Sequence, residues 1–266
     1  MIQARQRRNL LSAFAFFSLS ACAGPRTRQP ASQDAPAATS TREADRTQGA
    51  IAAAATPTAF ETPAPTAGGR MVEQVVALPA PRPQGTLSLE EALVKRRSLR
   101  AFAETGLTLA ELGKLLWAAQ GITHEAGLRT APSAGALYPL EIYAVTREAT
   151  YRYRPQGRQL IAHRHGDLRP ALHAAGLLQD SILTAPAVFV IAAVYARTER
   201  KYGAERTPRY VHLEAGHAAQ GLLLQAVALG LGGVPIGAFY DDQVQRALAL
   251  PADHAPLYLI PVGRPR

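Results

Sequence analysis

The stretch from Thr207 to Asp242, in which a long apolar helix pattern runs into a glycine-rich turn, constrains most strongly what this chain can fold into. One stripe of apolar residues recurs along it at steps of three and four residues: Val211, Ala215, Ala218, Ala219, Leu222, Leu223, Ala226 and Leu229. The opposite side is hardly more polar, because Leu224, Val227 and Ala228 lie there. A helix that is apolar nearly all round belongs in a core or in a subunit interface. We therefore expect this helix to be the central packing element of the fold.

A glycine-rich turn follows the helix. Gly230 stands where a C′ residue would end the helix, and Gly232, Gly233, Pro235 and Gly237 come next. Such a run lets the backbone approach a flat ligand closely and present N–H groups to it. From spacing alone, an ordinary tight turn is the simpler interpretation.

Residues 1–22 have the pattern of a secretory signal. A basic start precedes an apolar run over residues 10–17, which is shorter than the roughly 20 apolar residues that a spanning helix needs. The following Leu-Ser-Ala-Cys ends at Cys22 and resembles a bacterial lipoprotein processing box, in which the cysteine is lipidated. Cys22 is the one cysteine of the chain, so a disulfide framework is excluded. A cleaved signal for soluble secretion with an incidental cysteine remains the alternative.

These N-terminal features predict a location in the bacterial cell envelope, with an N-terminal lipid anchor to the membrane. Arg7 and Arg8 with the apolar residues after them loosely resemble a twin-arginine export signal. Residues 23–85 are rich in Ala, Pro and Thr and have few large apolar side chains, so we expect a disordered tether there. Within it, residues 71–78 can pack locally on the folded domain, which we expect over residues 86–266.

The net charge of +9 raises the question of nucleic-acid binding. The basic excess is almost all arginine and is dispersed, without a run of four basic residues or a basic strip interleaved with aromatics. We therefore expect no nucleic-acid partner, and the charge favours solubility and anionic small molecules instead.

Helix and strand patterns alternate through the domain. Capping boxes at Ser88 and Thr108 predict two helices. The other expected elements are strands over 140–145, 151–154, 158–164, 187–194 and 257–262 and helices over 168–176, 181–184 and 241–248.

Two short segments carry groups suited to a ligand. If Arg96–Phe102 is extended, Arg96, Ser98 and Arg100 point to one side and could grip a phosphate; a solvated basic turn is the alternative. The loop around Ser133 contains small residues that let a ligand approach the backbone. A serine hydrolase is excluded because Ala131 replaces the first glycine of its motif and a strand follows the loop.

A metal site is not expected. His212, Glu214 and His217 have side chains of the metal-ligand type, but their order differs from the H-E-x-x-H motif. Imidazoles five residues apart on a helix diverge.

Five motifs occur in one order: Arg-Arg-Ser-x-Arg-x-Phe, Pro-Ser-Ala-Gly-Ala-Leu-Tyr-Pro, Lys-Tyr-Gly, Arg-Tyr-x-x-x-Glu-x-Gly-His-x-x-Gln and Gly-Leu-Gly-Gly-Val-Pro-Ile-Gly-Ala-Phe. Together, over residues 87–266, they resemble the nitroreductase-like flavoproteins and, within them, the SagB/ThcOx-type dehydrogenases related to azoline oxidases. The resemblance implies an α+β fold with a central, mostly antiparallel sheet flanked by helices. It also implies a homodimer with FMN at the subunit interface.

The resemblance implies three groups of FMN-binding residues. The phosphate and ribityl chain would be held by Arg96, Arg97, Ser98 and Arg100, with Arg264 or Arg266 as a further phosphate contact. The flavin would be lined by Pro132, Ser133, Ala134 and Gly135, in many relatives from the partner subunit. The ring would lie against Pro235, Ile236, Gly237 and Ala238, with one of their N–H groups near N5, the atom that takes the hydride.

The catalytic pair implied by the resemblance is Lys201 and Tyr202, which match the Lys-Tyr pair of azoline oxidases. One of them would take a proton from a substrate carbon while a hydride passes to the flavin. Two features depart from the family: Gly221 stands where Asn is frequent, and azoline oxidases work in the cytoplasm, whereas this chain has an export signal. Two alternatives therefore remain open, a reductase of nitro compounds or quinones that uses NAD(P)H and a non-catalytic flavin-binding envelope lipoprotein.

Overall fold

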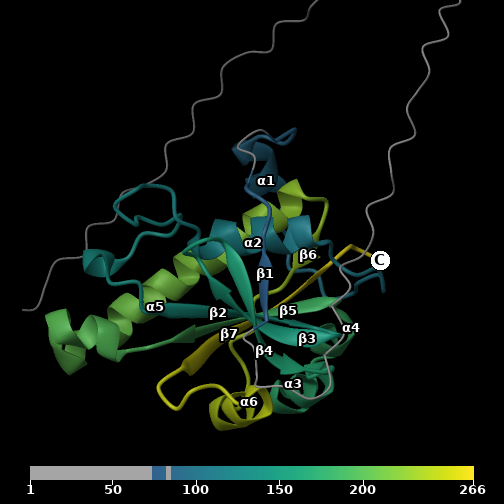
Figure 1. The fold of residues 1–266 in the computed structure, drawn as a ribbon. Coiled ribbons are helices and arrows are strands. Elements are labelled where there is room, and N and C mark those ends of the chain that lie inside the picture. Colours follow the sequence, from purple (N-terminus) through teal and green to yellow (C-terminus); the bar gives the residue numbers. More distant parts are fainter. Residues whose placement is uncertain (1–73, 82–84) are drawn as a thin grey trace, which may run out of the picture. The chain divides into compact units, whose positions relative to one another are not determined.

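The fold is seen in a computed structural model that describes residues 74–81 and 85–266 (Figure 1). The predicted signal, Cys22 and most of the predicted tether lie outside the described residues. In the described part, no helix combines the length and the apolarity that crossing a membrane would require.

A seven-stranded sheet runs through the middle of the domain, in the order β1-β4-β3-β2-β5-β7-β6. Every neighbouring pair of strands is antiparallel, which confirms the predicted α+β fold with an antiparallel sheet. The strands are β1 (Val75–Ala77), β2 (Leu140–Thr146), β3 (Ala149–Arg154), β4 (Gln159–His165), β5 (Ala187–Ala193), β6 (Gly232–Gly233) and β7 (Ala255–Gly263).

Helices cover both faces of the sheet (Figure 1). One face packs against α2 (Leu109–Gln120) and α5 (Ala196–Ala228), and the other against α3 (Arg169–Ala175), α4 (Asp180–Thr184) and α6 (Asp241–Leu248). Strand β5 shows why its sequence is a continuous apolar run. Its Phe189 and Ile191 belong to the core under α2 and α5, while Val188 and Val190 belong to the opposite core.

Both predicted capping boxes are formed. Ser88 caps α1 (Leu89–Lys95) through Glu91, and Thr108 caps α2 through Glu111, with reciprocal side-chain and backbone bonds in each case. Each box satisfies two backbone N–H groups that the first helical turn cannot pair.

Helix α5 confirms the apolar stripe. Seven of its eight residues are buried, and Leu229 is half-buried at the C-cap. Gly230 follows with a φ of 70°, as a C′ glycine does. Gly221 faces α2 so closely that a Cβ there would lie 2.6 Å from the Ala118 carbonyl oxygen. This glycine therefore sets how near α5 can come to α2.

The N-terminal part of α5 differs from the prediction. The sequence placed Lys201 and Tyr202 before the helix, but helical turns already begin at Ala196 and break at Gly203, which has a φ of 74° and a ψ of 163°. Glycine tolerates this left-handed region, so the helix can change direction there. The Lys-Tyr pair therefore lies in a short helical segment that begins at Ala196 and ends just before the kink at Gly203.

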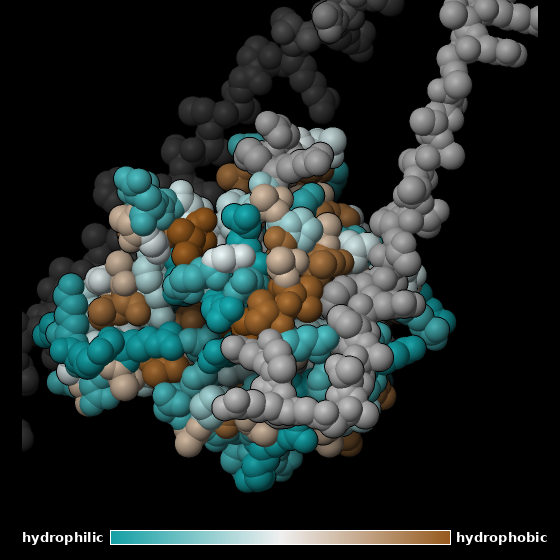
Figure 2. All heavy atoms as spheres, in the orientation of Figure 1, coloured by the Kyte–Doolittle hydropathy of each residue, from teal (hydrophilic) through white to brown (hydrophobic). Residues whose placement is uncertain are grey.

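Strand β1 lies inside the predicted tether. Val75–Ala77 pairs with β4, and the Leu78 amide donates to the Arg158 carbonyl at 2.8 Å. This pairing agrees with the expectation that residues 71–78 can pack locally on the domain, because an open sheet edge offers backbone partners to the segment. Figure 2 shows hydrophobic residues gathered where β1 lies, and Val75 is 40% exposed.

Candidate functional site

The Arg-Ser-x-Arg segment and the glycine-rich turn meet in the structure. Ser98 forms a parallel bridge with Gly233, and the Leu99 amide donates to the Gly233 carbonyl at 3.1 Å. A Cβ on Gly232 would lie 2.2 Å from Leu99 Cδ1, so only a glycine admits Leu99 at this distance. Two motifs far apart in sequence thus form one backbone unit after the end of α5.

The polar side chains of this unit are either free or already bound within the chain. Arg96 and Arg100, like the Ser98 hydroxyl, have no hydrogen-bond or ion-pair partner among the described residues. Arg97 instead donates to the Val94 and Arg96 carbonyls at 2.8 and 2.7 Å, which satisfies carbonyls at the end of α1. The free groups suit an anion, whereas the Arg97 guanidinium is engaged with the helix end.

The last residues of the chain run beside this unit. The Ala103 amide donates to the Arg264 carbonyl at 2.9 Å, and Phe102 bridges Pro265. The Arg264 guanidinium, however, binds Glu111 at 2.7 Å and the Gly106 carbonyl at 3.1 Å. Because these two bonds engage its guanidinium, Arg264 is not free to bind a phosphate.

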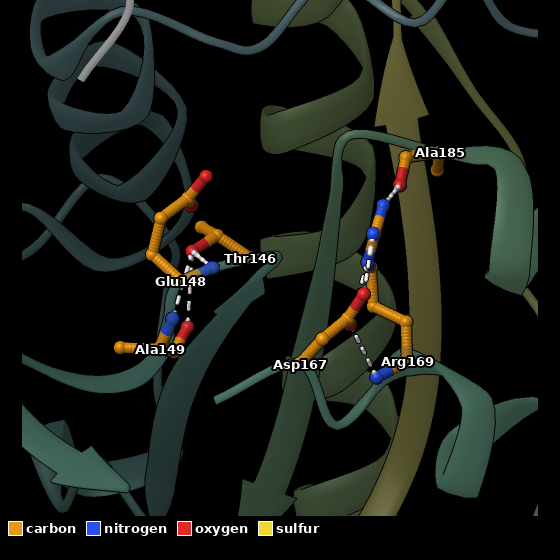
Figure 3. A network of polar contacts seen from close by, with 6 residues as sticks. All are labelled: Thr146, Glu148, Ala149, Asp167, Arg169 and Ala185. Carbon is orange, nitrogen blue, oxygen red and sulfur yellow. Dashed lines mark hydrogen bonds and ion pairs between the residues drawn. The ribbon is translucent and has the colours of Figure 1, made fainter. Parts of the chain in front are cut away.

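Arg266 borders a different space. It lines a cavity of about 650 Å³ whose lining contains none of the other predicted FMN-binding residues. On one wall of this cavity, the Arg169 guanidinium donates to the Asp167 carboxylate at 2.6 and 2.8 Å and to the Ala185 carbonyl at 2.8 Å (Figure 3). The bridge between Phe102 and Pro265 nevertheless brings the end of the chain beside the Arg96–Phe102 segment, so the phosphate contact through Arg266 stays a prediction.

The Pro235–Ala238 segment presents unused backbone donors. Ile236 is buried and exchanges two backbone bonds with Leu259, at 2.8 and 3.0 Å, which fixes the segment to β7. Gly237 and Ala238 are exposed, and their N–H groups meet no acceptor within the described ranges. Ala238 is held through its carbonyl, which accepts from Gln179 Nε2 at 3.0 Å. The donors are thus free while the backbone that carries them is anchored.

The Pro132–Gly135 loop packs against the Lys-Tyr pair. A Cβ on Gly135 would lie 2.9 Å from Lys201 Nζ and 3.0 Å from the Tyr202 hydroxyl. Gly135, Ala136 and Tyr138 have φ values of 62°, 54° and 47°, so the loop holds three residues in the left-handed region. Strained backbone of this kind is concentrated at functional sites. The structure thus brings together two predicted groups that are far apart in the sequence.

A buried carboxylate supports this loop from α5. Glu214 is 2% exposed and accepts from Gln120 Nε2 at 3.2 Å. Burial raises the pKa of the Glu214 carboxyl, while hydrogen bonds from Ser133 and Gln120 and the nearby Arg129 charge oppose that rise. The sequence contained a signal for this role, because Glu214 is the polar member of an otherwise apolar buried face.

The His-x-Glu-x-x-His residues do not converge. His212 Nε2 bonds the Tyr195 hydroxyl at 2.8 Å, and Glu214 is buried against Gln120. Within the described ranges, no group of three or more His, Cys, Asp or Glu side chains could hold a metal ion.

The two assembled units lie toward opposite ends of α5. The Gly135, Lys201 and Tyr202 unit adjoins its beginning, and the Ser98 and Gly233 unit follows its end. At about 1.5 Å per residue, the part of α5 between the kink at Gly203 and Ala228 spans roughly 35 to 40 Å. A single chain therefore does not bring the predicted phosphate-binding and loop residues into one site.

The domain is similar to known proteins over most of its length. The model of the nitroreductase family matches residues 93–264. A candidate nitroreductase of Methanocaldococcus jannaschii is 46% identical over 184 residues, which cover 67% of this chain and 91% of the relative.

Solved structures give the same match. A candidate nitroreductase of Ralstonia eutropha JMP134 is 31% identical with a TM-score of 0.67, over 73% of this chain and 90% of that one. An NADPH:FMN oxidoreductase of Vibrio harveyi, 23% identical with a TM-score of 0.50 over 66% and 68% of the two chains, shares the fold.

Proposed function

This chain belongs to the nitroreductase family, and on that premise we propose that it is an FMN-dependent oxidoreductase of the SagB/ThcOx type. Members of the family use flavin, and the chain is an oxidoreductase enzyme. The observation that carries the finer proposal is the contact of Gly135 with Lys201 Nζ and the Tyr202 hydroxyl. It places two proton-carrying groups against the loop that the resemblance assigns to the flavin.

The residues present suit FMN. Arg96, Arg100 and the Ser98 hydroxyl are without partners among the described residues, as a phosphate site requires. The free N–H groups of Gly237 and Ala238 are the kind of donor that stabilises negative charge on a reduced ring. Arg97 and Arg264 are left out of the proposed site, because their guanidiniums already bind carbonyl and carboxylate oxygens of this chain.

FMN, when bound, would supply the chemistry of accepting or giving a hydride. The proposed substrate is organic and azoline-like, and its oxidation requires that a carbon also lose a proton. Lys201 or Tyr202 would take that proton, and Gly135, lacking a side chain, leaves room for both groups. The anchored Pro235–Ala238 backbone would orient the ring, since its bonds to Leu259 hold it in place.

A second copy of the chain would complete the site. Nitroreductases are typically dimers that act on small molecules. The separation of the two units along α5 supports the proposal of a homodimer with FMN between its subunits. The outer face of α5 supports it too, because Leu213 is 55% exposed, Leu224 and Val227 are half-exposed, and nothing lies within 4 Å of a Cβ built on Gly216.

A second candidate function is reduction of nitro compounds or quinones with NAD(P)H. The 46% identical relative, named as a candidate nitroreductase, favours it. Bleaching of bound flavin by NAD(P)H without oxygen would support this candidate. Flavin that both donors leave oxidised would favour dehydrogenation of an organic substrate.

We expect the purified full-length chain to be yellow and to retain FMN through gel filtration. The double variant Ser98→Ala/Arg100→Gln should bind FMN at least ten- to hundredfold more weakly, because each hydrogen bond to a charged group contributes about 1.5–3 kcal/mol. Flavin fluorescence titration measures the affinity. Arg97→Gln is the matched control and should retain FMN, since the Arg97 guanidinium donates to backbone carbonyls at the end of α1. A folded but colourless wild-type protein would remove the proposal.

We further propose that the protein is exported and held at the bacterial envelope by a lipid on Cys22. Cells fed an alkyne-labelled fatty acid should incorporate label into the wild-type chain and not into Cys22→Ala, which should leave the membrane fraction. The physical reason is that Cys22 supplies the thiol to which the lipid is joined. A wild-type chain that stays unlabelled and soluble would support a plain secretion signal instead.

A further inference from the structure

A second cavity, of about 400 Å³, lies behind the loop that contacts the Lys-Tyr pair. Its walls come from the end of that loop, from β2 and β3, and from the start of α5. Leu137, Leu140 and Ile142 contribute apolar surface to it, and the volume lies within the range of small-molecule pockets.

The charge on these walls is strongly positive. Four arginines line the cavity, Arg129, Arg152, Arg154 and Arg197, against the single carboxylate of Glu141. Arg197 forms an ion pair with that carboxylate, so Glu141 is already neutralised. Arg152 has no hydrogen-bond or ion-pair partner in the described part of the chain, although it lies beside the cavity. The unbalanced charge favours an anion.

Two buried polar atoms at this cavity are without partners, although Arg129 Nη1 donates to Gln120 Oε1 at 3.0 Å. Tyr153 is 3% exposed, and neither its hydroxyl nor Arg129 Nε bonds any atom of the described residues. Burial raises the pKa of the Tyr153 hydroxyl to about 12 and lowers the pKa of Arg129, as expected of groups removed from water. Unpaired buried groups are costly, so an acceptor that bonds them would gain from both.

The 650 Å³ cavity beside Arg266 serves as a contrast. There the buried Arg169 is satisfied by Asp167 and by the Ala185 carbonyl, as Figure 3 shows. Thr146 is likewise engaged, with the Ala149 carbonyl at 3.1 Å. The buried polar side chains of that cavity, Arg169 and Thr146, need no ligand to complete their bonds, whereas Arg129 Nε and the Tyr153 hydroxyl do.

We propose that the 400 Å³ cavity binds a small organic carboxylate, its oxygens toward Arg129 and Tyr153 and its apolar body against Leu137 and Leu140. A planar carboxylate matches the donor fork of a guanidinium and can accept several further bonds. The apolar wall distinguishes an organic acid from an inorganic anion. This proposal does not depend on the proposed function, because none of these residues belongs to the proposed FMN site.

Benzoate is a suitable probe, and the protein is used as the purified full-length chain with whatever flavin it holds. Isothermal titration calorimetry at constant ionic strength should show saturable benzoate binding and no binding of benzamide, which has the same body without the charge. Inorganic phosphate should bind at least tenfold more weakly than benzoate, because it lacks the apolar body. Equal affinity for benzoate and benzamide, or tighter binding of phosphate, would overturn the proposal.

Variants locate the binding. Tyr153→Phe should weaken benzoate binding roughly tenfold or more, since it removes one hydrogen bond to a charged group. Its unliganded Tm should stay equal to that of the wild type or rise, because the hydroxyl has no partner to lose. Arg152→Gln should weaken binding by a smaller factor, because Arg152 leaves the opposite face of β3 and acts through its charge, while Arg147→Gln, which borders the 650 Å³ cavity, should not weaken it.

FMN content separates this proposal from the proposed function. Tyr153→Phe should keep the flavin content of the wild type while losing benzoate affinity. A Tyr153→Phe variant that binds benzoate as the wild type does, or that has a lowered Tm without ligand, would refute the assignment of the hydroxyl to the site.

Discussion

Replacing Lys201 by methionine is expected to lower turnover of a thiazoline-bearing peptide about 10²- to 10⁴-fold, the usual contribution of a positioned proton-transfer group. The substrate would lose a proton and a hydride to become a thiazole, and dioxygen would be the final acceptor. The reason is the position of Lys201 Nζ. It would lie 2.9 Å from a Cβ built on Gly135, and it lies 5.6 Å from the centre of the Tyr202 ring. Stopped-flow absorbance of the flavin, with single-turnover product analysis, measures the effect.

The matched controls separate chemistry from binding. Lys201→Met should retain FMN, because Lys201 is outside the proposed phosphate site, and Lys114→Met on α2 should turn over as the wild type does. Tyr202→Phe keeps the ring contact with Tyr210, whose centre is 4.6 Å away, and removes only the hydroxyl. Unchanged turnover in both Lys201→Met and Tyr202→Phe would exclude the catalytic pair. A wild-type protein that binds flavin and turns over nothing would favour a binding-only lipoprotein.

Gly221→Ala is expected to destabilise the folded chain by about 1–3 kcal/mol, the range for overpacking a tight contact. The new Cβ would lie 2.6 Å from the Ala118 carbonyl oxygen, and a backbone oxygen inside α2 cannot move aside as a flexible side chain can. Urea denaturation followed by circular dichroism gives the free energy of unfolding.

Gly113→Ala provides the control on the partner helix. Its Cβ would meet the nearest atom, Leu78 Cβ, at 3.4 Å, an ordinary contact, and alanine favours a helix over glycine by about 1 kcal/mol. We therefore expect Gly113→Ala to be neutral or stabilising. Equal stability of Gly221→Ala and the wild type would show that α2 and α5 are not packed as closely as the structure has them.

Local patterns predicted most of the secondary structure. The capping boxes, the stripe on α5, the β3–β4 hairpin and the continuous apolar run of β5 all depend on residues close in sequence, where helix and strand periodicity decide the outcome. Strand β1 could not be predicted in this way. Three residues in an Ala- and Pro-rich segment become a strand because the edge of β4 supplies their partners.

The sequence predicted which motifs belong to the candidate site, but it could not predict which side chains of those motifs are already bound within the chain. The sequence could place Arg97 beside Arg96, yet the free carbonyls at the end of α1 determine where the Arg97 guanidinium goes. Arg264 is diverted in the same way by Glu111. Gly221 stands where Asn is frequent in the family, and the structure gives this glycine a packing role against α2. Such outcomes depend on distant segments, which no local pattern contains.

The segment Arg96–Phe102 pairs with segments that are synthesised much later, so its folding must wait for them. Ser98 needs Gly233, and Ala103 needs Arg264, so the early segment has no partner until the ribosome has made nearly all of the domain. A nascent chain that has completed α5 already carries Glu214 and the Lys-Tyr pair but lacks Gly233 and Arg264, with which the early segment pairs. Assembly of the Arg96–Phe102 segment onto the glycine-rich turn and the last strand is therefore confined to chains whose translation has passed β7.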